Sequence, residues 1–422
     1  MTKPGLAARR AAVDLLDAIT GERRLLSELL PEAVEALPAE ERARAQRLAA
    51  NCLRWMDRAD RVLGPYLRRR PHLTGHNILR LAVVELAVDR SAAHGVVDAA
   101  VELCRNSPDT KRMSGLVNAV LRKVAVDLDR WDSLPMPRLP KWLRKPLLTA
   151  YGKTAVEAME MAHAAGAPLD ITSKPGTDWA AKLGGSVLPT GSLRLQEAGQ
   201  VSALPGYAEG GWWVQDAAAA LPARILAVQP GERVLDMCAA PGGKALQLAA
   251  AGARVTALDI SEARMERVRE NLARTGLAAD LVIADALEWR PQQPFDAILL
   301  DAPCSATGTI RRHPDLPHAK DLGGLPELTA LQAALLDRAA GMLRPGGRLV
   351  YCTCSLLPEE GEAQVTAVIE RRPKLALDRA ALTLPGIEPH WQVPEGLRLR
   401  PDYWPERGGM DGFFIAAMRK AA

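Results

Sequence analysis

The chain lacks the features that would place it in a membrane or in an oxidising compartment. No uninterrupted apolar run of ~18 residues occurs in the sequence, so a membrane-spanning helix is not expected. The amino-terminal residues lack the apolar core of a signal peptide. Only 6 cysteines occur in 422 residues, and their positions show no disulfide-framework spacing. We therefore expect a reduced, cytoplasmic protein with no membrane association.

The signatures of two competing kinds of site are also missing. The glycine loop at residues 238–244 lacks the G-x-G-x-x-G spacing of a dinucleotide site, and hydride transfer does not need thiols at strand ends. Cys352 and Cys354 form a C-x-C pair rather than the C-x-x-C of a zinc knuckle, and no second knuckle follows. A dehydrogenase is therefore disfavoured. A zinc site is disfavoured as well, and we expect no metal at Cys238, Cys304, Cys352 and Cys354.

Length and charge indicate several domains of different character. A chain of 422 residues is too long for one ordinary core, and its 48% hydrophobic and 25% charged residues are typical of globular proteins. Residues 1–131 contain 22 Lys and Arg against 17 Asp and Glu, whereas the remainder contains 32 against 33. The basic front half favours a polyanionic partner, although solvated arginine-rich helices remain an alternative.

Residues 5–131 have apolar side chains at three- and four-residue steps, which predicts an all-helical domain. Helical patterns run over 40–67, 93–105 and 114–126, and no acid, histidine or cysteine cluster here has catalytic or metal spacing. This region therefore reads as a binding domain.

Arginines in this region could contact a phosphate backbone. Arg54, Arg58 and Arg61 would share one helix face, which could form a stripe matched to successive phosphates. Asp57 and Asp60 interrupt the stripe, so ordinary ion pairs are the alternative. The residues from His76 to Leu86, followed by those from Ser114 to Arg122, resemble the NusB-like RNA-binding helical domain. This resemblance implies an RNA-contacting module over residues 1–131.

The middle of the chain has a mixed pattern. Prolines are frequent between residues 132 and 146, which predicts a linker. Residues 147–220 are interpreted as a small α+β middle subdomain, with a helix near 153–165. A further helix is expected to begin near Ala217, with Asp216 as its N-cap.

From residue 221 to residue 422, apolar strands alternate with helices, which predicts a parallel, doubly wound α/β sheet. Helices are expected over 262–275 and 328–342. The expected strands are 233–238, 254–259, 280–285, 297–301, 348–352 and 413–418.

The first of these strands leads into a glycine loop and then a helix. Gly242 and Gly243 allow the backbone to approach a ligand closely, and the N–H groups at a helix N-terminus favour anionic groups. Asp259 ends the second strand, about 20 residues further on, where an acid can accept hydrogen bonds from ribose hydroxyls. Asp285 ends the third strand, where it can reach an adenine amino group. Asp259, Asp285 and Asp301 therefore lie along one edge of the predicted sheet, and we call this set of acids the acidic rim.

Two more strands lead to thiols. The strand at 297–301 ends in Asp301, and Pro303 then halts the ladder just before Cys304. The stretch 347–355 has the same design and places Cys354 at the end of another strand. Ligands of open α/β sheets bind at the carboxyl ends of the strands, so we expect both thiols and Asp301 to face one substrate.

Three motifs together carry a resemblance over nearly the whole chain. Cys238-Ala-Ala-Pro-Gly-Gly-Lys244, Asp301-Ala-Pro-Cys-Ser305 and Thr353-Cys-Ser355 resemble the RNA cytosine-C5 methyltransferases that use S-adenosylmethionine. With the NusB-like front domain, the chain is similar to the bacterial small-subunit ribosomal RNA members of that family. The resemblance implies a Rossmann-like methyltransferase domain over 221–422, acting as a monomer on a cytosine of 16S ribosomal RNA. The family's cofactor residues correspond to Cys238, Ala239, Ala240, Pro241, Gly242, Gly243, Lys244, Asp259, Asp285 and Asp301.

The resemblance also implies a catalytic cycle. Cys354 corresponds to the nucleophile, and addition of its thiolate to carbon 6 makes carbon 5 of the base nucleophilic. Cys304 is then placed to assist release of the product. Lys244 is a candidate for the cation that favours the thiolate, and Asp301 could bond ring nitrogen 3. Arg311, Arg312 and His313 are candidates for holding the flanking phosphates, and Cys352 receives no role. The alternative from another class is a non-catalytic RNA-binding factor, which the intact thiols disfavour.

Overall fold

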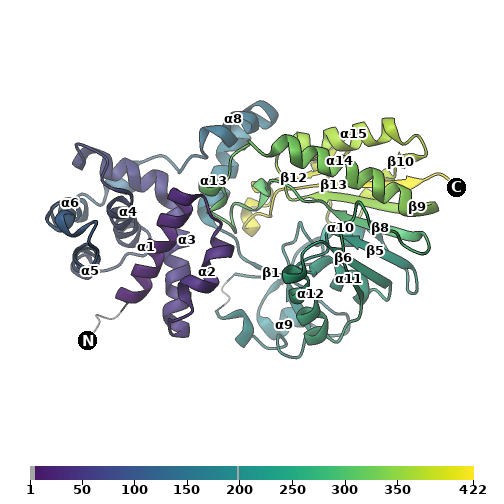
Figure 1. Cartoon of the computed structure of the whole chain (residues 1–422), viewed down its shortest axis with the longest axis horizontal. Coiled ribbons are helices and arrows are strands. Elements are labelled where there is room, and N and C mark those ends of the chain that lie inside the picture. Colours follow the sequence, from purple (N-terminus) through teal and green to yellow (C-terminus); the bar gives the residue numbers. More distant parts are fainter. Residues whose placement is uncertain (1–4, 197–198) are drawn as a thin grey trace. The chain divides into compact units, whose positions relative to one another are not determined.

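The structure is a computed structural model that describes residues 5–196 and 199–422. The chain forms two compact units (Figure 1). The helical unit comprises the residues up to Ala165 together with Ile310–Leu322, and the sheet unit comprises Gly166–Thr309 and Gly323–Ala422. These two units differ from the four segments predicted from the sequence (1–131, 132–146, 147–220 and 221–422), and that division stays a prediction.

The helical unit is built around α4 (Leu73–Ala87), whose residues from Gly75 to Ala87 are all buried. A helix that is apolar on most sides needs neighbours all round it. The helices α3 (Ala39–Leu63), α5 (Ala93–Arg105) and α6 (Ser114–Val126) agree with the helical patterns of the sequence. The other helices of the unit are α1 (Leu6–Glu22), α2 (Leu26–Val34), α7 (Arg130–Ser133), α8 (Lys141–Ala165) and α13 (Leu316–Ala319).

The arginine stripe expected on α3 is not a free surface. Arg54 donates to the backbone carbonyls of His163 (3.0 Å) and Arg311 (2.8 Å). Arg58 is buried, lies 5.0 Å from the ring centroid of Trp131 and donates to the Leu134 carbonyl at 2.6 Å. Arg61 forms an ion pair with Asp57 at 2.7 Å. The phosphate-stripe interpretation is therefore wrong for Arg54 and Arg58, because backbone carbonyls already occupy their guanidinium groups.

The segment expected to be a linker is partly helical. The helix α8 begins at Lys141 and includes Pro146, so the extended linker is confined to the residues between α7 and α8. Gly152, with φ 77° and ψ 169°, kinks α8 in its middle, and the part after the kink is the helix expected near 153–165.

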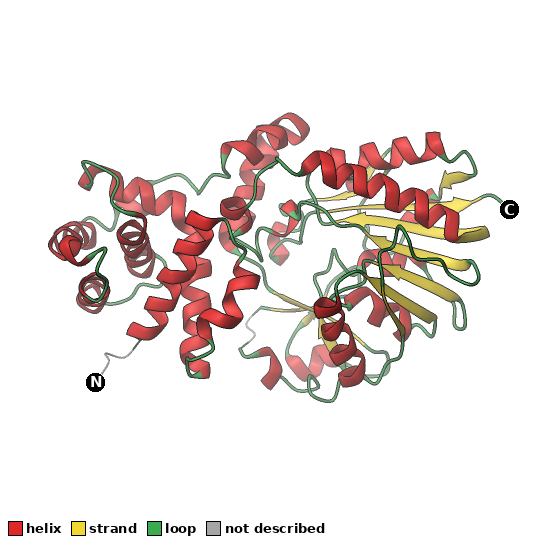
Figure 2. Ribbon diagram, in the orientation of Figure 1, coloured by secondary structure: helices red, strands yellow, loops and turns green. Residues whose placement is uncertain are grey.

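The sheet unit contains one large sheet, whose strands are yellow in Figure 2. The order of its strands is β11-β12-β13-β9-β8-β5-β6-β7, and β10 pairs with β13. The strands β7, β6, β5, β8 and β9 are parallel, and β13 then pairs antiparallel with β9. Their bounds are β5 (Arg233–Met237), β6 (Arg254–Asp259), β7 (Asp280–Ile283), β8 (Phe295–Asp301), β9 (Leu343–Thr353), β10 (Leu375–Leu377), β11 (Gln392–Val393), β12 (Gly396–Leu399) and β13 (Phe413–Lys420).

Helices cover both faces of this sheet, as the doubly wound pattern predicts. Val234 and Leu299 pack into the core shared with α10, α11 and α12, while Leu235 and Ile298 pack into the core shared with α14 and α15. This alternation follows from the two-residue period of a strand. The helices are α10 (Leu221–Leu226), α11 (Gly243–Ala250), α12 (Glu262–Thr275), α14 (Leu325–Met342) and α15 (Glu362–Arg371).

A second, antiparallel sheet belongs to the same unit. Its strand order is β2-β3-β1-β4, and its buried Asp170 pairs with Arg194 at 2.6 Å. The helix expected to begin near Ala217 begins instead at Leu221, and residues 217–220 form a turn. The Asp216 carboxylate caps that turn by accepting from the N–H of Ala218 at 2.8 Å. The remaining elements are β1 (Leu169–Ser173), α9 (Trp179–Leu183), β2 (Ser186–Val187), β3 (Leu193–Leu195) and β4 (Trp212–Val214).

Throughout the described residues, no helix combines the length and the apolar character needed to cross a bilayer.

Candidate active site at the carboxyl edge of the sheet

Five parallel strands end at one edge of the large sheet, and the predicted residues lie there. The register pairs Met237 of β5 with both Leu258 of β6 and Leu300 of β8, and it pairs Asp301 with Cys352 of β9. The loops that follow these strands therefore begin side by side, at the edge where open α/β sheets bind ligands.

The two predicted thiols meet. The Sγ atoms of Cys304 and Cys354 lie 3.4 Å apart, and both side chains are half-buried. Gly308 fixes the approach of the two loops, because its N–H donates to the Cys354 carbonyl at 2.9 Å and its own carbonyl accepts from Gly412 at 2.8 Å. A Cβ atom on Gly308 would lie 1.9 Å from the Gly412 carbonyl oxygen, so a larger residue does not fit.

The surroundings of Cys304 oppose ionisation of its thiol. The hydrogen bond with Cys354, then burial, then the negative charges of Cys354 and Glu360 raise the pKa of Cys304 well above its ordinary value. A pair of thiols at this distance shares one proton, since two adjacent negative charges repel. Cys304 is therefore held in its neutral thiol form beside Cys354.

A chain of polar contacts runs along the same edge. The Lys244 ammonium group donates to Oδ2 of Asp301 at 2.6 Å, and the Cys352 thiol donates to Oδ1 at 3.4 Å. Burial alone would lower the pKa of Lys244, but the Asp301 carboxylate raises it above its ordinary value. Burial and the Asp301 charge raise the pKa of Cys352, so this cysteine is a neutral donor, a role that the sequence did not suggest.

The backbone of the glycine loop between β5 and α11 is fixed by hydrogen bonds to Asp259. The Asp259 carboxylate accepts from the N–H groups of Ala240 (3.1 Å) and Ser261 (3.0 Å). Cys238 and Gly242 have φ values of 61° and 104°, which turn the chain sharply before α11. Asp259, predicted to accept from ribose hydroxyls, thus also fixes the loop backbone.

Asp285 lies beyond the end of β7, which stops at Ile283, two residues short of the predicted strand end. It is half-buried, and its Oδ1 accepts from the N–H of Leu287 at 2.8 Å. Its predicted contact with an adenine amino group stays a prediction.

Asp236 is a candidate site residue that the sequence motifs do not identify. It lies within β5, is fully buried, and neither carboxylate oxygen has a hydrogen-bond partner among the described residues. Burial is the main cause that raises the pKa of Asp236 to about 8; Lys244 opposes the shift, and Asp301 and Asp259 add to it. The detectable signal was an acid inside the apolar run Val-Leu-Asp-Met. Orphaned acceptors beneath a glycine loop and a helix N-terminus fit a cofactor with amino and hydroxyl donors.

The segment after the Cys304 loop is part of the helical unit. Arg311 is 1% exposed, and its carbonyl accepts from Arg54, so the predicted phosphate contact of its side chain is wrong. His313 is exposed and Arg312 is half-buried, and their phosphate contacts stay predictions. Trp142 donates to the Pro317 carbonyl at 3.3 Å, which helps to fix the segment.

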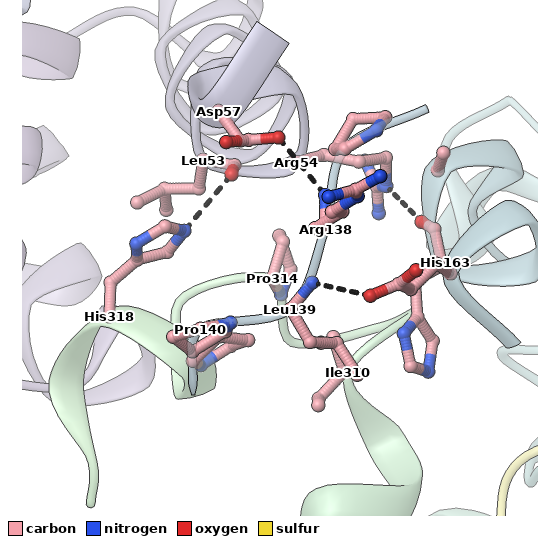
Figure 3. Close-up of a pocket in the computed structure, with 14 residues that line it drawn as sticks. Leu53, Arg54, Asp57, Arg138, Leu139, Pro140, His163, Ile310, Pro314 and His318 are labelled. Atoms are coloured by element: carbon pink, nitrogen blue, oxygen red, sulfur yellow. Dashed lines mark hydrogen bonds between the residues drawn. The ribbon is translucent and has the colours of Figure 1, made fainter. Parts of the chain in front are cut away.

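Figure 3 shows a narrow pocket of about 60 Å³ within the helical unit, where α3, α8 and residues 310–318 meet. Burial, then the charges of Arg311 and Arg54, lower the pKa of His163 in this pocket to about 3. His318 bonds the Leu53 carbonyl at 3.1 Å. None of the predicted catalytic residues lines this pocket.

No group of three or more His, Cys, Asp or Glu side chains in residues 5–196 and 199–422 is arranged to hold a metal ion.

The architecture agrees with known proteins. A family model described as 16S rRNA methyltransferase RsmB/F matches residues 223–419, and the NusB family model matches residues 6–126. A crystal structure of PH0851, 23% identical, aligns over 100% of both chains with a TM-score of 0.74 and shows the same fold. The methyltransferase homolog protein of Pyrococcus horikoshii, 27% identical, aligns over 65% of this chain and 93% of its own with a TM-score of 0.54.

A glycine loop and acidic rim on a Rossmann-like sheet, joined to a NusB-like helical region, define a methyltransferase that depends on S-adenosylmethionine. Ribosomal RNA small subunit methyltransferase B of Pseudomonas putida is 36% identical to this chain, with 99% of each sequence covered. The Vibrio cholerae enzyme of the same name is 34% identical, with coverage of 98% and 97%. The chain belongs to the ribosomal RNA small subunit methyltransferase B family.

Proposed function

We propose that the protein methylates carbon 5 of a cytosine in 16S ribosomal RNA through a transient bond between Cys354 and carbon 6 of the base. The observation that carries this proposal is the 3.4 Å separation of the Cys304 and Cys354 sulfur atoms at the edge that also holds the glycine loop. An acceptor oxygen or nitrogen is already nucleophilic and can be methylated without a thiol. Carbon 5 of cytosine needs a thiol, because it is a poor nucleophile until a thiolate adds to carbon 6.

The rim residues divide the binding of the methyl donor among them. Residues 238–244, Asp259 and Asp285 would hold S-adenosylmethionine, which supplies an electrophilic methyl group when it is bound. Asp236 contributes a buried carboxyl group beneath the loop. The fixed backbone around Gly242 lets the loop approach the ligand without reorganisation.

The arrangement of the two thiols suits the first step. Cys354, as a thiolate, attacks carbon 6, and the electron pair of the carbon 5–carbon 6 double bond moves onto the ring towards nitrogen 3. Asp301, whose side chain is 29% exposed, would stabilise the charge that develops at nitrogen 3 by passing to it a proton that Asp301 shares with the Lys244 ammonium group. Lys244 holds that carboxylate in place.

The same pair suits the last step. Once Cys354 has become a thioether, it no longer accepts a hydrogen bond from Cys304 and no longer carries charge. Two of the causes that raise the pKa of Cys304 are then removed, so this pKa falls in the adduct. The Cys304 thiolate can take the proton from carbon 5, and the electron pair of that C–H bond restores the ring double bond and expels Cys354 as a thiolate.

The helical unit would supply RNA binding, because it contains the NusB-family region and the excess of basic residues. The target base must leave its stack before the thiols can reach carbon 6. We propose that a monomer in the cytoplasm performs this reaction.

The test separates the two thiols. Cys354→Ala should abolish methylation of unmodified 16S ribosomal RNA by labelled methyl donor, at least 10⁴-fold by analogy with loss of other covalent nucleophiles. Cys304→Ala should form the RNA–protein adduct but fail to release it, leaving a shifted band on a denaturing gel. Cys104→Ala, a buried cysteine of the helical unit, is the control and should behave as wild type. Label at any atom other than carbon 5 of a cytosine, or loss of activity without adduct in both variants, would refute the proposal.

A further inference from the structure

A serine follows each of the two thiols, and the two serines meet beneath them. Ser305 and Ser355 are both buried, and their hydroxyl oxygens lie 3.2 Å apart. The Thr307 hydroxyl joins them at 3.2 Å from Ser305 and 3.3 Å from Ser355, and it also accepts from the N–H of Leu356 at 2.9 Å. The loops that carry Cys304 and Cys354 are therefore joined by hydroxyl groups as well as by the sulfur contact.

A single carboxylate gathers these groups. Glu360 is fully buried, and its Oε2 accepts from both serine hydroxyls at 2.5 Å. Its Oε1 accepts from the backbone N–H of Ser305 at 2.8 Å and from the Gln332 amide at 3.0 Å. Four donors on one carboxylate offset the large free-energy penalty of a buried charge, and charge-assisted hydrogen bonds of this length are strong.

The carboxylate is itself fixed in place. The backbone carbonyl of Glu360 accepts from the Tyr351 hydroxyl at 2.7 Å and from the Thr353 hydroxyl at 3.2 Å, so β9 holds it. Gln332 of α14 also donates to the Pro303 carbonyl at 2.8 Å, just before Cys304. A satisfied buried network of this kind has one geometry, because any shift leaves a buried polar group without its partner.

We propose that Glu360 is a positioning residue that binds the Cys304 loop to the Cys354 loop and so sets the spacing of the two thiols. Its consequence for turnover depends on the proposed cytosine chemistry, whereas its effect on the thiols does not. Glu360 touches neither sulfur through a hydrogen bond and acts through the serines.

The charge of Glu360 has a second effect on the pair. The Glu360 charge belongs, after the Cys354 contacts and burial, to the causes that raise the pKa of Cys304. Tyr351 also faces this thiol, and burial and then the Cys304 charge raise the pKa of Tyr351. A negative charge at the Glu360 position opposes ionisation of Cys304 and so helps to keep this thiol protonated.

The first experiment uses the full chain without RNA or methyl donor. Alkylation of each cysteine by iodoacetamide is followed against pH by peptide mass spectrometry, because only the thiolate reacts. In Glu360→Gln the reactivity of Cys304 should rise at a pH about one unit lower than in wild type. Glu359→Gln, which removes the same charge from the exposed neighbouring residue, is the matched control and should leave the profile unchanged.

The second experiment measures turnover on 16S ribosomal RNA. Glu360→Gln should lower kcat about 10- to 100-fold, with KM for the RNA unchanged, because small displacements of reacting groups have effects of this size. Ser305→Ala, which keeps the charge and removes one hydroxyl, should lower kcat without shifting the Cys304 profile and serves if Glu360→Gln does not fold. A wild-type alkylation profile together with wild-type kcat in Glu360→Gln would overturn the proposal. If wild-type protein itself forms no adduct, the alkylation result still decides the role of Glu360, and only the proposed function fails.

Discussion

Two aspartates, the partly exposed Asp60 of the helical unit and the buried Asp236 of the sheet unit, have pKa values shifted in opposite directions. In the helical unit, burial alone would raise the pKa of Asp60, but hydrogen bonds from Arg80 (2.6 Å) and His76 (3.2 Å) lower it to about 2. In the sheet unit, Asp236 has no such partner, and its pKa rises to about 8. In the helical unit, the Asp60 carboxylate is stabilised by an ion pair with Arg80. At the edge of the sheet, burial of Asp236 disfavours its ionised form. Unfavourable states of this kind concentrate where ligands bind.

The largest expected effect comes from removing the ionisable group of Asp236, whose ionisation is disfavoured by burial. The folded state holds the Asp236 proton between about pH 4 and pH 8 whereas the unfolded state releases it, so wild-type stability falls as pH rises through this window. Asp236→Asn should therefore be more stable than wild type, by roughly 3 kcal/mol at pH 8 and by much less at pH 4. Urea unfolding at several pH values measures the difference. Asp280→Asn, at an exposed position of the same sheet, should show no such trend, and a pH-independent gap for Asp236→Asn would contradict the comparison.

The converse substitution in the helical unit should have a smaller effect of opposite sign. The pKa of Asp60 is depressed, so its contribution is present above about pH 4 and is lost as pH falls towards 2. Asp60→Asn should lower the free energy of unfolding by about 1 kcal/mol near neutral pH, since the side chain is partly exposed and solvent screens the pair. The deficit should shrink as the solution is acidified from pH 4. Exposed Asp109 provides the control, because Asp109→Asn should change little at any pH.

The smallest expected effect tests whether exposed arginines of the helical unit contact RNA. Arg68 and Arg69 are exposed just beyond α3, unlike Arg54 and Arg58. Replacing both Arg68 and Arg69 by Ala should reduce the slope of log affinity against log salt by about 1 to 2 units. The adjacent pair Arg371 and Arg372, bound to Asp337 in the sheet unit, is the matched control. An equal change of slope for both pairs would show that location in the helical unit is irrelevant.

Local signals in the sequence predicted the regular elements well. The expected helix 262–275 coincides with α12, because Ser261 caps its N-terminus by accepting from Arg264 and Gly276, with φ 60°, ends it. The strand 254–259 coincides with β6 for a similar reason, since a glycine precedes it and Asp259 turns the chain after it. The predicted thiols also met, because both motifs end parallel strands of one sheet.

Features that depend on distant residues could not be predicted in this way. The phosphate stripe on α3 failed because the partners of Arg54 lie more than 100 residues away along the chain. The helix start at Leu221 was misplaced because Asp216 caps a turn and also accepts from Asp411 at 3.2 Å. Asp236 was overlooked because the absence of a partner is a property of the folded environment and leaves no mark in a short motif.

Residues 310–322 have a consequence for how the protein can be divided. They belong to the helical unit, yet they lie between β8 and α14 of the sheet unit in the sequence. The polypeptide therefore passes between the units three times, after Ala165, after Thr309 and after Leu322. Cutting the gene after Ala165 would yield a fragment whose Cys304 loop runs into thirteen residues that have lost Leu26, Leu53 and Trp142, the partners that hold them. Cutting it after Thr309 or after Leu322 would instead divide the sheet unit itself.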